Sequence, residues 1–547
     1  MILSGGNYRV QCFLSVAVVA TLSLALLFLL RRTLGTGRAT PCVWLLLNLI
    51  LFSPIQVHNW LWPMQFACFL PFAFLGLCLA AFYSDLAPGR RLAACLACGW
   101  AASFSFMNGM LLWLVMLPAI LRDRRFATTA SRRRFAGIWL ASAALAADLY
   151  FPGLLENTAD PHYRPGFGDV PATVSTARLF QEHPLGALVR AGGFAAAMYG
   201  NAVSRGFPVL RPVEFSARCG AVLLAAGVVL WIALARRGRL AGPAFGWATL
   251  ALNGFLTAGL VSVGRMWDVP ERPLTLRYTT YGSFALLGVS GLAGLALAGP
   301  HAESAPGDRP GPRDLGFVAI GILVALLGVN WTYGLDLMSE WRATRLATRA
   351  VIHFHEQPQV LVSVFREYPD FLKFWAGARP TVLDEGVATL ARLGYWHPPL
   401  AANARLDQFK LARAPLDTEH GDIESVVKKR SGAIELRGRA RFGSAATPEL
   451  VLFTSADSAG QPVIRAACLT QSPPRWLFQG LGMDAQFLFL LDTKGTHYGR
   501  FECELQPSAV PAGESRTLEP WALDFARGRV QRIQVEVVLP EAPTRVR

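Results

Sequence analysis

The chain has 547 residues, of which 53% are hydrophobic and 16% are charged, and its formal net charge is +15. Soluble chains usually carry nearer a quarter charged residues, so this composition excludes a purely soluble protein. The apolar content also excludes disorder over most of the length. Up to Gly334 there are 26 arginines, no lysine and 13 acidic residues, so the basic charge belongs to the apolar part. Its position indicates loop charge that sets membrane topology, and it does not indicate nucleic-acid binding.

Ten stretches before Gly334 are apolar enough to predict membrane helices, which need about 20 residues each. They cover 11–30, 42–56, 65–84, 91–106, 109–121, 136–153, 215–235, 243–263, 277–298 and 315–334. The fourth and fifth are short, and Asn108-Gly109 between them predicts a tight turn. We therefore expect an α-helical polytopic membrane domain of about ten helices over 1–334.

Arginines predict the orientation of this domain. Sixteen of them follow the first, third, fifth, seventh and ninth stretches, all on one side of the membrane. The positive-inside rule places that side in the cytoplasm. We expect a multi-pass protein of a bacterial inner (cytoplasmic) membrane, with everything after Gly334 periplasmic. The same orientation places Met1 outside, which an N-terminally truncated gene model lacking an upstream helix would explain.

The sequence changes character after Gly334. Residues 335–420 mix helical periods, such as Trp341 to Phe354, with proline breaks, and 421–547 become strand-like. Short alternating segments separated by turn residues predict an antiparallel β-sandwich. They are AIELRGRARF, ELVLFTS, PVIRAACL, QFLFLLDT, GRFECELQ and RIQVEVVL. The predicted fold is thus a membrane domain followed by an extracytoplasmic α/β region that ends in this sandwich.

The nine cysteines divide in the same way. Cys95 and Cys98 form a CxxC pair, but they lie in a run of alanine and leucine, which favours packing over redox or metal chemistry. Cys468 and Cys503 lie in the polar part. An oxidising compartment would allow them to pair, and the sequence alone leaves the pairing open.

Three arginines near the external helix ends are candidate ligands for phosphate: Arg265, Arg272 and Arg277, with Tyr278 beside them. Arginine makes bidentate, permanently charged contacts with phosphate. A phosphate linked to a lipid is the ligand expected at this depth. The alternative is that these arginines reach to the interface and pair with nearby carboxylates.

Other polar residues near the same face are also candidates for substrate binding. His58, Asn59 and Gln65 surround Trp60 and Trp62 on a short external turn, which suits either an aromatic belt or a sugar site. Asp148 is a carboxylate inside an apolar span. Such a group needs a partner or water, and a functional and a structural role are equally compatible with it.

The long external loop 154–214 supplies acidic candidates for catalysis. Glu156, Asp160 and Asp169 are the carboxylates that we consider as general bases for a sugar hydroxyl, against the alternative of solvated loop charge. Within the loop, the Gly/Ala-rich segment 186–203 predicts a re-entrant or interfacial helix. P-loop, HExxH, GxSxG and zinc-spacing motifs are absent from the sequence. We assign no metal ligand and leave a divalent metal open.

Three segments resemble parts of bacterial polytopic membrane proteins that are similar to the GT-C glycosyltransferase superfamily. They are NWLWPMQFACFLPFAFLGLCLAAF, SFSFMNGMLLWLVMLPAILR and RPLTLRYTTYGSF. The resemblance implies transfer of a sugar from a polyprenyl-phosphate donor at the non-cytoplasmic face. It also implies a catalytic acidic residue in the first external loop. Here the first acidic residue is Asp85, on the predicted cytoplasmic side, so no catalytic residue of the family is carried over.

The resemblance makes a glycosyltransferase-like protein the leading hypothesis, with an envelope glycan or lipid as acceptor. The expected partners are membrane lipid, a polyprenyl-phosphate-linked sugar and envelope glycan, and not nucleic acid. Two alternatives stay open. One is a non-enzymatic protein that binds or assembles envelope glycan, since the C-terminal region looks like modules that bind carbohydrate. The other is a transporter of lipid-linked glycan.

Overall fold

The computed structural model of the chain describes residues 8–159, 181–265, 272–298, 312–367, 401–471 and 499–539, apart from gaps of one to five residues inside these ranges, together with 389 and 392. The described residues form two compact units, which meet in sequence between Leu335 and Asp336. One helix, α13 (Pro312–His353), begins in the first unit and ends in the second.

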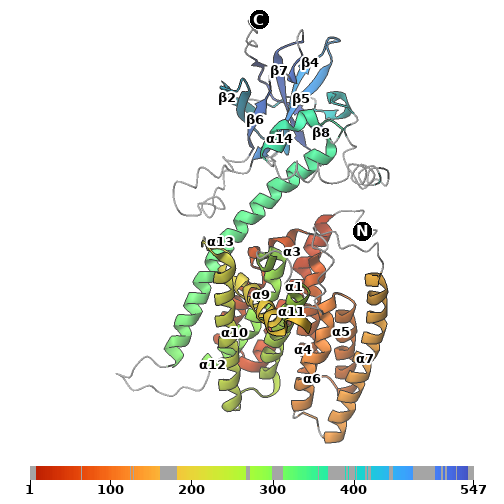
Figure 1. Cartoon of the computed structure of the whole chain (residues 1–547), viewed down its shortest axis with the longest axis vertical. Helices are drawn as coiled ribbons and strands as arrows, with labels where there is room; N and C mark the ends of the chain where they lie inside the picture. The colour runs from red at the N-terminus through yellow and green to blue at the C-terminus, as the bar shows by residue number, and fades with distance from the viewer. Residues whose placement is uncertain are drawn as a thin grey trace. The chain divides into compact units, whose positions relative to one another are not determined.

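The first unit is built from helices that run side by side (Figure 1). They are α1 (Tyr8–Leu34), α2 (Ala39–Leu51), α3 (Val57–Leu61), α4 (Phe66–Phe82), α5 (Pro88–Ser103), α6 (Leu111–Arg122), α7 (Thr129–Ala159), α9 (Pro184–Ser204), α10 (Pro212–Arg236), α11 (Phe245–Arg265), α12 (Thr279–Leu297) and the first part of α13. All ten apolar stretches are thus helical. The predicted turn at Asn108-Gly109 is confirmed as a short 3-10 helix, η4 (Met107–Met110).

Six helical segments are long and apolar enough to cross a membrane. They are Val10–Leu34, Ala39–Leu61, Thr129–Pro152, Pro212–Arg236, Gly242–Arg265 and Leu276–Leu297. Phe66–Phe82, Met107–Arg122 and Ile320–Leu335 are shorter apolar helices, and α5 belongs to neither group. The described residues therefore indicate a membrane protein, and its remaining spans stay predictions.

Helix α12 lies at the centre of the first unit, and 83% of its most apolar window is buried. Its glycines allow neighbouring helices to approach closely. A Cβ atom at Gly282 would lie 3.0 Å from the Tyr199 carbonyl oxygen of α9, and one at Gly294 would lie 3.1 Å from Val43 of α2. Gly288 faces the backbone of Ala251 in α11 in the same way. Small residues are the usual means of helix packing in membranes, where lipid is as apolar as the protein.

Helices α9 and α10 cross through a second set of small residues. A Cβ atom at Gly200 would collide with the Ser216 carbonyl oxygen, and one at Gly220 would collide with that of Ala196. Ser204 and Ser216 share a hydrogen bond of 2.6 Å at the same crossing. The predicted helix over 186–203 is confirmed. Its second half is buried, while large apolar side chains of its first half, such as Leu185 and Val189, are exposed.

Arginine-bearing helix ends meet at one end of the first unit, which we call the arginine-rich end. Arg32, close to the end of α1, forms an ion pair with Asp85, which follows α4. This hydrogen-bonded guanidinium holds the pKa of Asp85 below its ordinary value. Arg125 donates a hydrogen bond of 2.6 Å to the Phe82 carbonyl oxygen, and Arg122 lies over the ring of Phe245 at the start of α11. Three of the predicted arginine-bearing loops are thus gathered at the same end.

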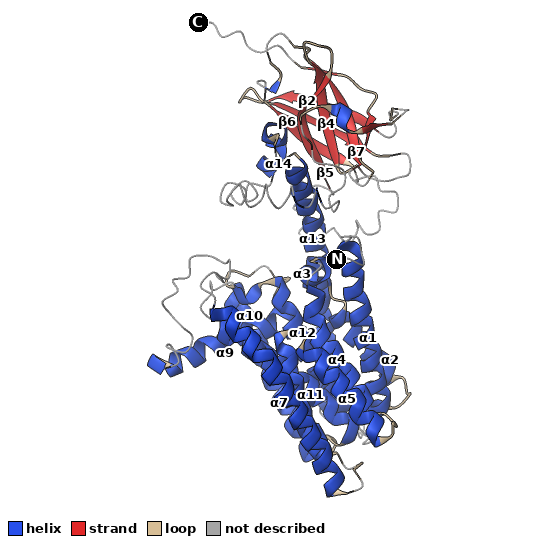
Figure 2. Ribbon diagram, turned by 90° about the vertical axis from the view of Figure 1, so that its right-hand side faces the viewer, coloured by secondary structure: helices blue, strands red, loops and turns tan. Residues whose placement is uncertain are grey.

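The second unit contains one curled, mixed β-sheet (Figure 2). Its strand order is β1-β8-β7-β4-β5-β6-β3-β2, with β9 paired to β7, and β1 and β8 are parallel. The strands are β1 (Lys410–Leu411), β2 (Gly421–Lys428), β3 (Ile434–Ala440), β4 (Leu450–Ala456), β5 (Pro462–Gln471), β6 (Arg500–Leu505), β7 (Thr517–Asp524), β8 (Arg529–Arg532) and β9 (Val537–Val538).

The predicted β-sandwich is not confirmed, because the described strands form a single hydrogen-bonded path. Strand β5 is long enough to pair with β4 along most of its length and with β6 at Thr470 and Gln471, so it joins both halves. Strands β2 and β7 were not among the predicted segments. Strand β7 contains Pro520, and proline is rare in interior strands. The predicted strand QFLFLLDT lies outside the described residues. RIQVEVVL contributes the last residue of β8 and the short β9.

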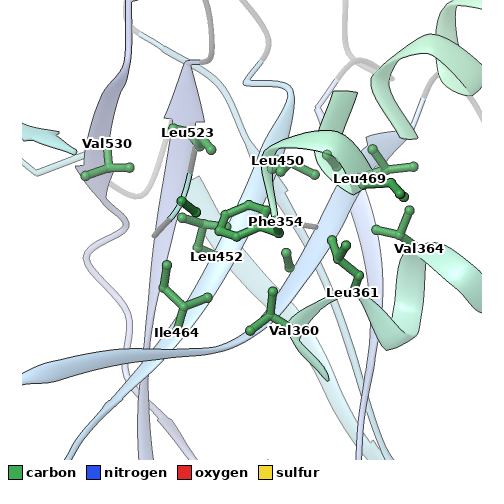
Figure 3. Close-up of a cluster of buried hydrophobic side chains, with 14 of the residues drawn as sticks. Phe354, Val360, Leu361, Val364, Leu450, Leu452, Ile464, Leu469, Leu523 and Val530 are labelled. Carbon is green, nitrogen blue, oxygen red and sulfur yellow. The ribbon is translucent and has the colours of Figure 1, made fainter. Parts of the chain in front are cut away.

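Both faces of this sheet are covered. In β4, Leu450 and Leu452 face one cluster, and Val451 and Phe453 face another. The first cluster is completed by Phe354, which follows α13, and by η8 (Pro358–Leu361) and α14 (Val362–Glu367), as Figure 3 shows. Alternate strand residues point to opposite faces, so a strand that is apolar throughout needs cover on both sides.

Cys468 and Cys503 form a disulfide within the second cluster, with a Cα–Cα distance of 5.4 Å. The two residues continue the register of β5 and β6, which pairs Thr470 with Phe501. The bond therefore links the two strands at which the halves of the sheet meet. The pairing that the sequence left open is present in the structure.

We predict that Gly200→Leu weakens the membrane unit, because the new side chain has to displace the backbone of α10. Overpacking of this kind costs about 1–3 kcal/mol or more. The measurement is the unfolding temperature of the detergent-purified protein. Gly193→Leu is the matched control, since a Cβ there meets nothing within 4 Å. Equal unfolding temperatures for the two variants would contradict the close α9–α10 crossing.

Candidate functional site

Two candidate motifs that are about 220 residues apart in sequence meet in the first unit. The Asn59 side chain in α3 donates a hydrogen bond of 2.9 Å to the carbonyl oxygen of Arg277 in η7 (Leu276–Tyr278). Its amide nitrogen also donates to the hydroxyl of Thr280, in the first turn of α12. His58 and Asn59 therefore lie beside Arg277 and Tyr278, and we call this group the Arg277 cluster.

A buried polar network holds the backbone of the cluster. The Thr280 hydroxyl donates to Oε1 of Gln56 at 2.7 Å, and the Gln56 amide donates to the carbonyl oxygens of Ile50 and Leu51 at 3.2 and 3.1 Å. These two carbonyls belong to the last turn of α2, where carbonyl oxygens lack the usual donor from the next turn of helix. Ile50 also accepts a bond of 3.4 Å from the Ser53 N–H. The network thus ties the end of α2 to the start of α12, and it fixes the position of Arg277 between them.

Arg277 is half-buried, and its guanidinium lies 5.1 Å from the ring centroid of Tyr278. His58, Cys68 and Tyr281 are near enough for its charge to act on their titration. Gln65 joins the same group, because the Cys68 thiol donates to its Oε1 at 2.9 Å. The structure therefore brings His58, Asn59, Gln65, Arg277 and Tyr278 together, as a common site requires.

Two buried acceptor atoms flank the start of α12. Asn59 donates to Thr280 and Asn201 of α9 donates to Thr279 at 2.9 Å, but the side-chain oxygens of both asparagines lack a hydrogen-bond partner among the described residues. Both asparagines are fully buried. An unsatisfied buried acceptor costs free energy unless water or a ligand donates to it. Sites for hydroxyl or water donors therefore lie next to the Arg277 cluster.

The arrangement favours an anion. Arg277 carries a permanent positive charge, and the first turn of α12, which follows at Thr279, has the positive end of a helix dipole. Helix starts of this kind bind phosphate groups. Tyrosine and histidine side chains beside them suit the polar part of a lipid-linked substrate.

The other predicted substrate residues are Arg265, Arg272 and Asp148, and the structure describes them to different degrees. Arg265 ends α11 and is half-buried, and Arg272 belongs to η6 (Arg272–Leu274), with its side chain outside the described set. Asp148 is exposed in α7, a helix that packs on α5 and α6. It has no ion-pair or hydrogen-bond partner among the described residues. The structure therefore separates Asp148 from the elements that form the Arg277 cluster.

The three acidic candidates for catalysis are not placed by the structure. Glu156 is in the last part of α7, but its side chain lies outside the described residues, as do Asp160 and Asp169. Within the described part of the chain, no three His, Cys, Asp or Glu residues are grouped as metal ligands are. Cys95 is buried and Cys98 is half-buried, and both members of the CxxC pair are free thiols.

Sequence reasoning missed Gln56, Asn201 and Thr280 as members of the site. Gln56 lies two residues before His58, and Thr280 lies inside the RYTTY segment, so both were close to residues that we had selected. The feature of the sequence that could have identified them is a polar side chain within an otherwise apolar segment. Asn201 carries the same signal in a Gly/Ala-rich helix, where polar side chains often hydrogen-bond between helices.

No protein-family model, curated protein or solved structure gives a significant match to this chain.

We predict that Asn59→Leu and Thr280→Val destabilise the protein by about 1–3 kcal/mol each, because each leaves buried partners unsatisfied. The double variant should lose less than the sum of the two, since the residues share one hydrogen bond. Thermal unfolding of the wild type and the three variants in the same detergent measures this coupling. Strictly additive losses would mean that the two residues do not act as one network.

Proposed function

We propose that the protein is a glycosyltransferase-like protein of a bacterial inner membrane that binds a polyprenyl-phosphate-linked sugar at the Arg277 cluster. The observation that carries the proposal is the convergence of His58 and Asn59 with Arg277 and Tyr278. A permanent cation, a helix start and aromatic rings at one place suit a sugar phosphate on a lipid carrier.

The position of the cluster supports a ligand that is itself in the membrane. Asn59 lies near the end of the candidate span Ala39–Leu61, and Arg277 lies at the start of Leu276–Leu297. Arginine side chains near the ends of membrane helices reach the headgroup zone. A polyprenyl chain in the bilayer would present its phosphate at this depth.

The transfer that we propose is an inverting displacement. The acceptor hydroxyl oxygen bonds to the anomeric carbon, while the bond from that carbon to the donor phosphate oxygen breaks. A carboxylate takes the hydroxyl proton, and Glu156, Asp160 and Asp169 are the candidates. Arg277 stabilises the charge that develops on the departing phosphate, which is its largest contribution to the rate.

We further propose that the arginine-rich end faces the cytoplasm and that the second unit is periplasmic. The gathered arginines support the first statement through the positive-inside rule. The Cys468–Cys503 disulfide supports the second, because such bonds persist in oxidising compartments. In this arrangement the curled sheet serves as a sandwich-like module that binds the glycan acceptor.

We predict that Arg277→Ala lowers sugar transfer from a polyprenyl-phosphate donor to envelope glycan by about 10²-fold, the usual effect of losing one charge-stabilising donor. Arg277→Lys should recover only part of the rate, because lysine lacks the bidentate geometry. The measurement is transfer of radiolabelled sugar in membranes with matched expression. Arg218→Ala, at an exposed arginine of α10, is the control.

Binding of farnesyl phosphate, compared with farnesol, separates the possible outcomes. Loss of both binding and transfer in Arg277→Ala supports the proposal. Wild-type transfer in that variant would refute it. Phosphate-dependent binding without any transfer by the wild type would instead favour a non-enzymatic protein of envelope glycan assembly.

We predict that Cys468 and Cys503 are oxidised in cells if the second unit is periplasmic. Cells are quenched with acid, and free thiols are then blocked with N-ethylmaleimide in a neutral denaturing buffer. The disulfide is reduced afterwards, and the released thiols are labelled with PEG-maleimide. Two labels are expected per chain, and none in the Cys468→Ser, Cys503→Ser double variant. A bacterial host that lacks its periplasmic thiol oxidase should also give none. Absence of labels from the wild type would contradict the proposed placement.

A further inference from the structure

A groove of about 340 Å³ lies between α6 and α10, with α11 along its floor. Its lining is apolar apart from Arg122 and Thr249, and Val115, Val228 and Phe255 are typical members. Val228 and Leu252 are among the exposed large hydrophobic residues of this unit. The groove is therefore open to the surroundings of the helices.

The groove runs from the arginine-rich end towards the middle of the helices. Arg122, Trp231 and Phe245 line it at that end, and Phe255 lies ten residues further along α11. At 1.5 Å per residue its length is about 15 Å. That is half the thickness of the hydrocarbon core of a bilayer, or one leaflet.

Arg122 provides a positive charge where the groove meets the arginine-rich end. Its guanidinium lies 5.2 Å from the centroid of the Phe245 ring, and it has no carboxylate partner among the described residues. It ends α6 beside the other arginines of this end. A cation above an apolar channel is complementary to an anionic headgroup above a hydrocarbon chain.

We propose that this groove holds one acyl chain of an anionic membrane phospholipid, with its phosphate at Arg122. The site is separate from the Arg277 cluster and does not depend on the proposed transfer reaction. A length of one leaflet and a cation at one end favour a lipid as the occupant. The volume of about 340 Å³ is at the lower end of the range of small-molecule sites, about 300–1,000 Å³.

The test is native mass spectrometry of the full chain in detergent with added dioleoyl phosphatidylglycerol. We expect one retained phosphatidylglycerol. Val228→Trp, which fills the groove, should weaken retention by about tenfold or more, equivalent to at least about 1.4 kcal/mol. Val229→Trp, at the neighbouring exposed valine outside the lining, is the matched control and should retain the lipid.

A second pair of variants tests the same groove from α11, in case Val228→Trp fails to fold. Leu252→Trp should also lose the lipid, and Leu260→Trp, at an exposed leucine outside the lining, should keep it. Arg122→Gln should weaken phosphatidylglycerol but not dioleoylglycerol, which has the same chains and no phosphate. Arg133→Gln, at an exposed arginine of the same end, should change neither.

Equal retention by the groove variants and their controls would overturn the proposal. So would a dimer in the wild-type spectrum that dissociates in Val228→Trp, because a second copy would then occupy the groove. Retention that depends on the groove but is the same for phosphatidylglycerol and dioleoylglycerol would overturn the role of Arg122.

Discussion

The close approach of α12 to its neighbours is the constraint on which the rest of the membrane unit depends. Helices in a bilayer gain little from hydrophobic burial against each other, so their packing depends on how closely their backbones fit. Gly282, Gly288 and Gly294 allow α12 to contact α9, α11 and α2 in turn. Because the helix is held on several sides, its first turn has a defined position, and so has Arg277 immediately before it.

The Arg277 cluster depends on the fixed position of the first turn of α12. Asn59 donates to Thr280, Thr280 donates to Gln56, and the Gln56 amide donates to the last turn of α2. These bonds connect α2, α3 and α12 without placing a charge in the network. The positive charge of Arg277 is half-buried beside the ring of Tyr278, where a phosphate would gain more than it would in water. The arginine-rich end has arginines that contact carboxylates, backbone oxygens or rings, whereas Arg277 lies next to a buried network of neutral polar side chains.

The second unit reaches its stability by different means. Its sheet has apolar residues on both faces, so it needs the segment around Phe354 on one side and its own curvature on the other. The disulfide lies where the two halves of the sheet join, and it constrains the unfolded chain between two cysteines that are 35 positions apart. Such a unit is suited to an oxidising compartment, in agreement with its proposed periplasmic position.

The sequence by itself determined the local elements. Apolar runs were sufficient for every helix that we predicted in the first unit, and alternation was sufficient for β3 to β6, because both patterns act over a few neighbouring residues. Strand β7, which contains Pro520, was not predicted. The sequence predicted two sheets, and the structure has one because β5 pairs with both β4 and β6.

The tertiary structure alone decided which candidates form a site. Asn59 and Arg277 are joined by a hydrogen bond between residues 218 positions apart, whereas Asp148, equally polar in an apolar span, is exposed on another helix. The spacing of residues in the sequence does not predict such contacts. They depend on how whole helices pack together, whereas the hydrophobic period describes each helix separately.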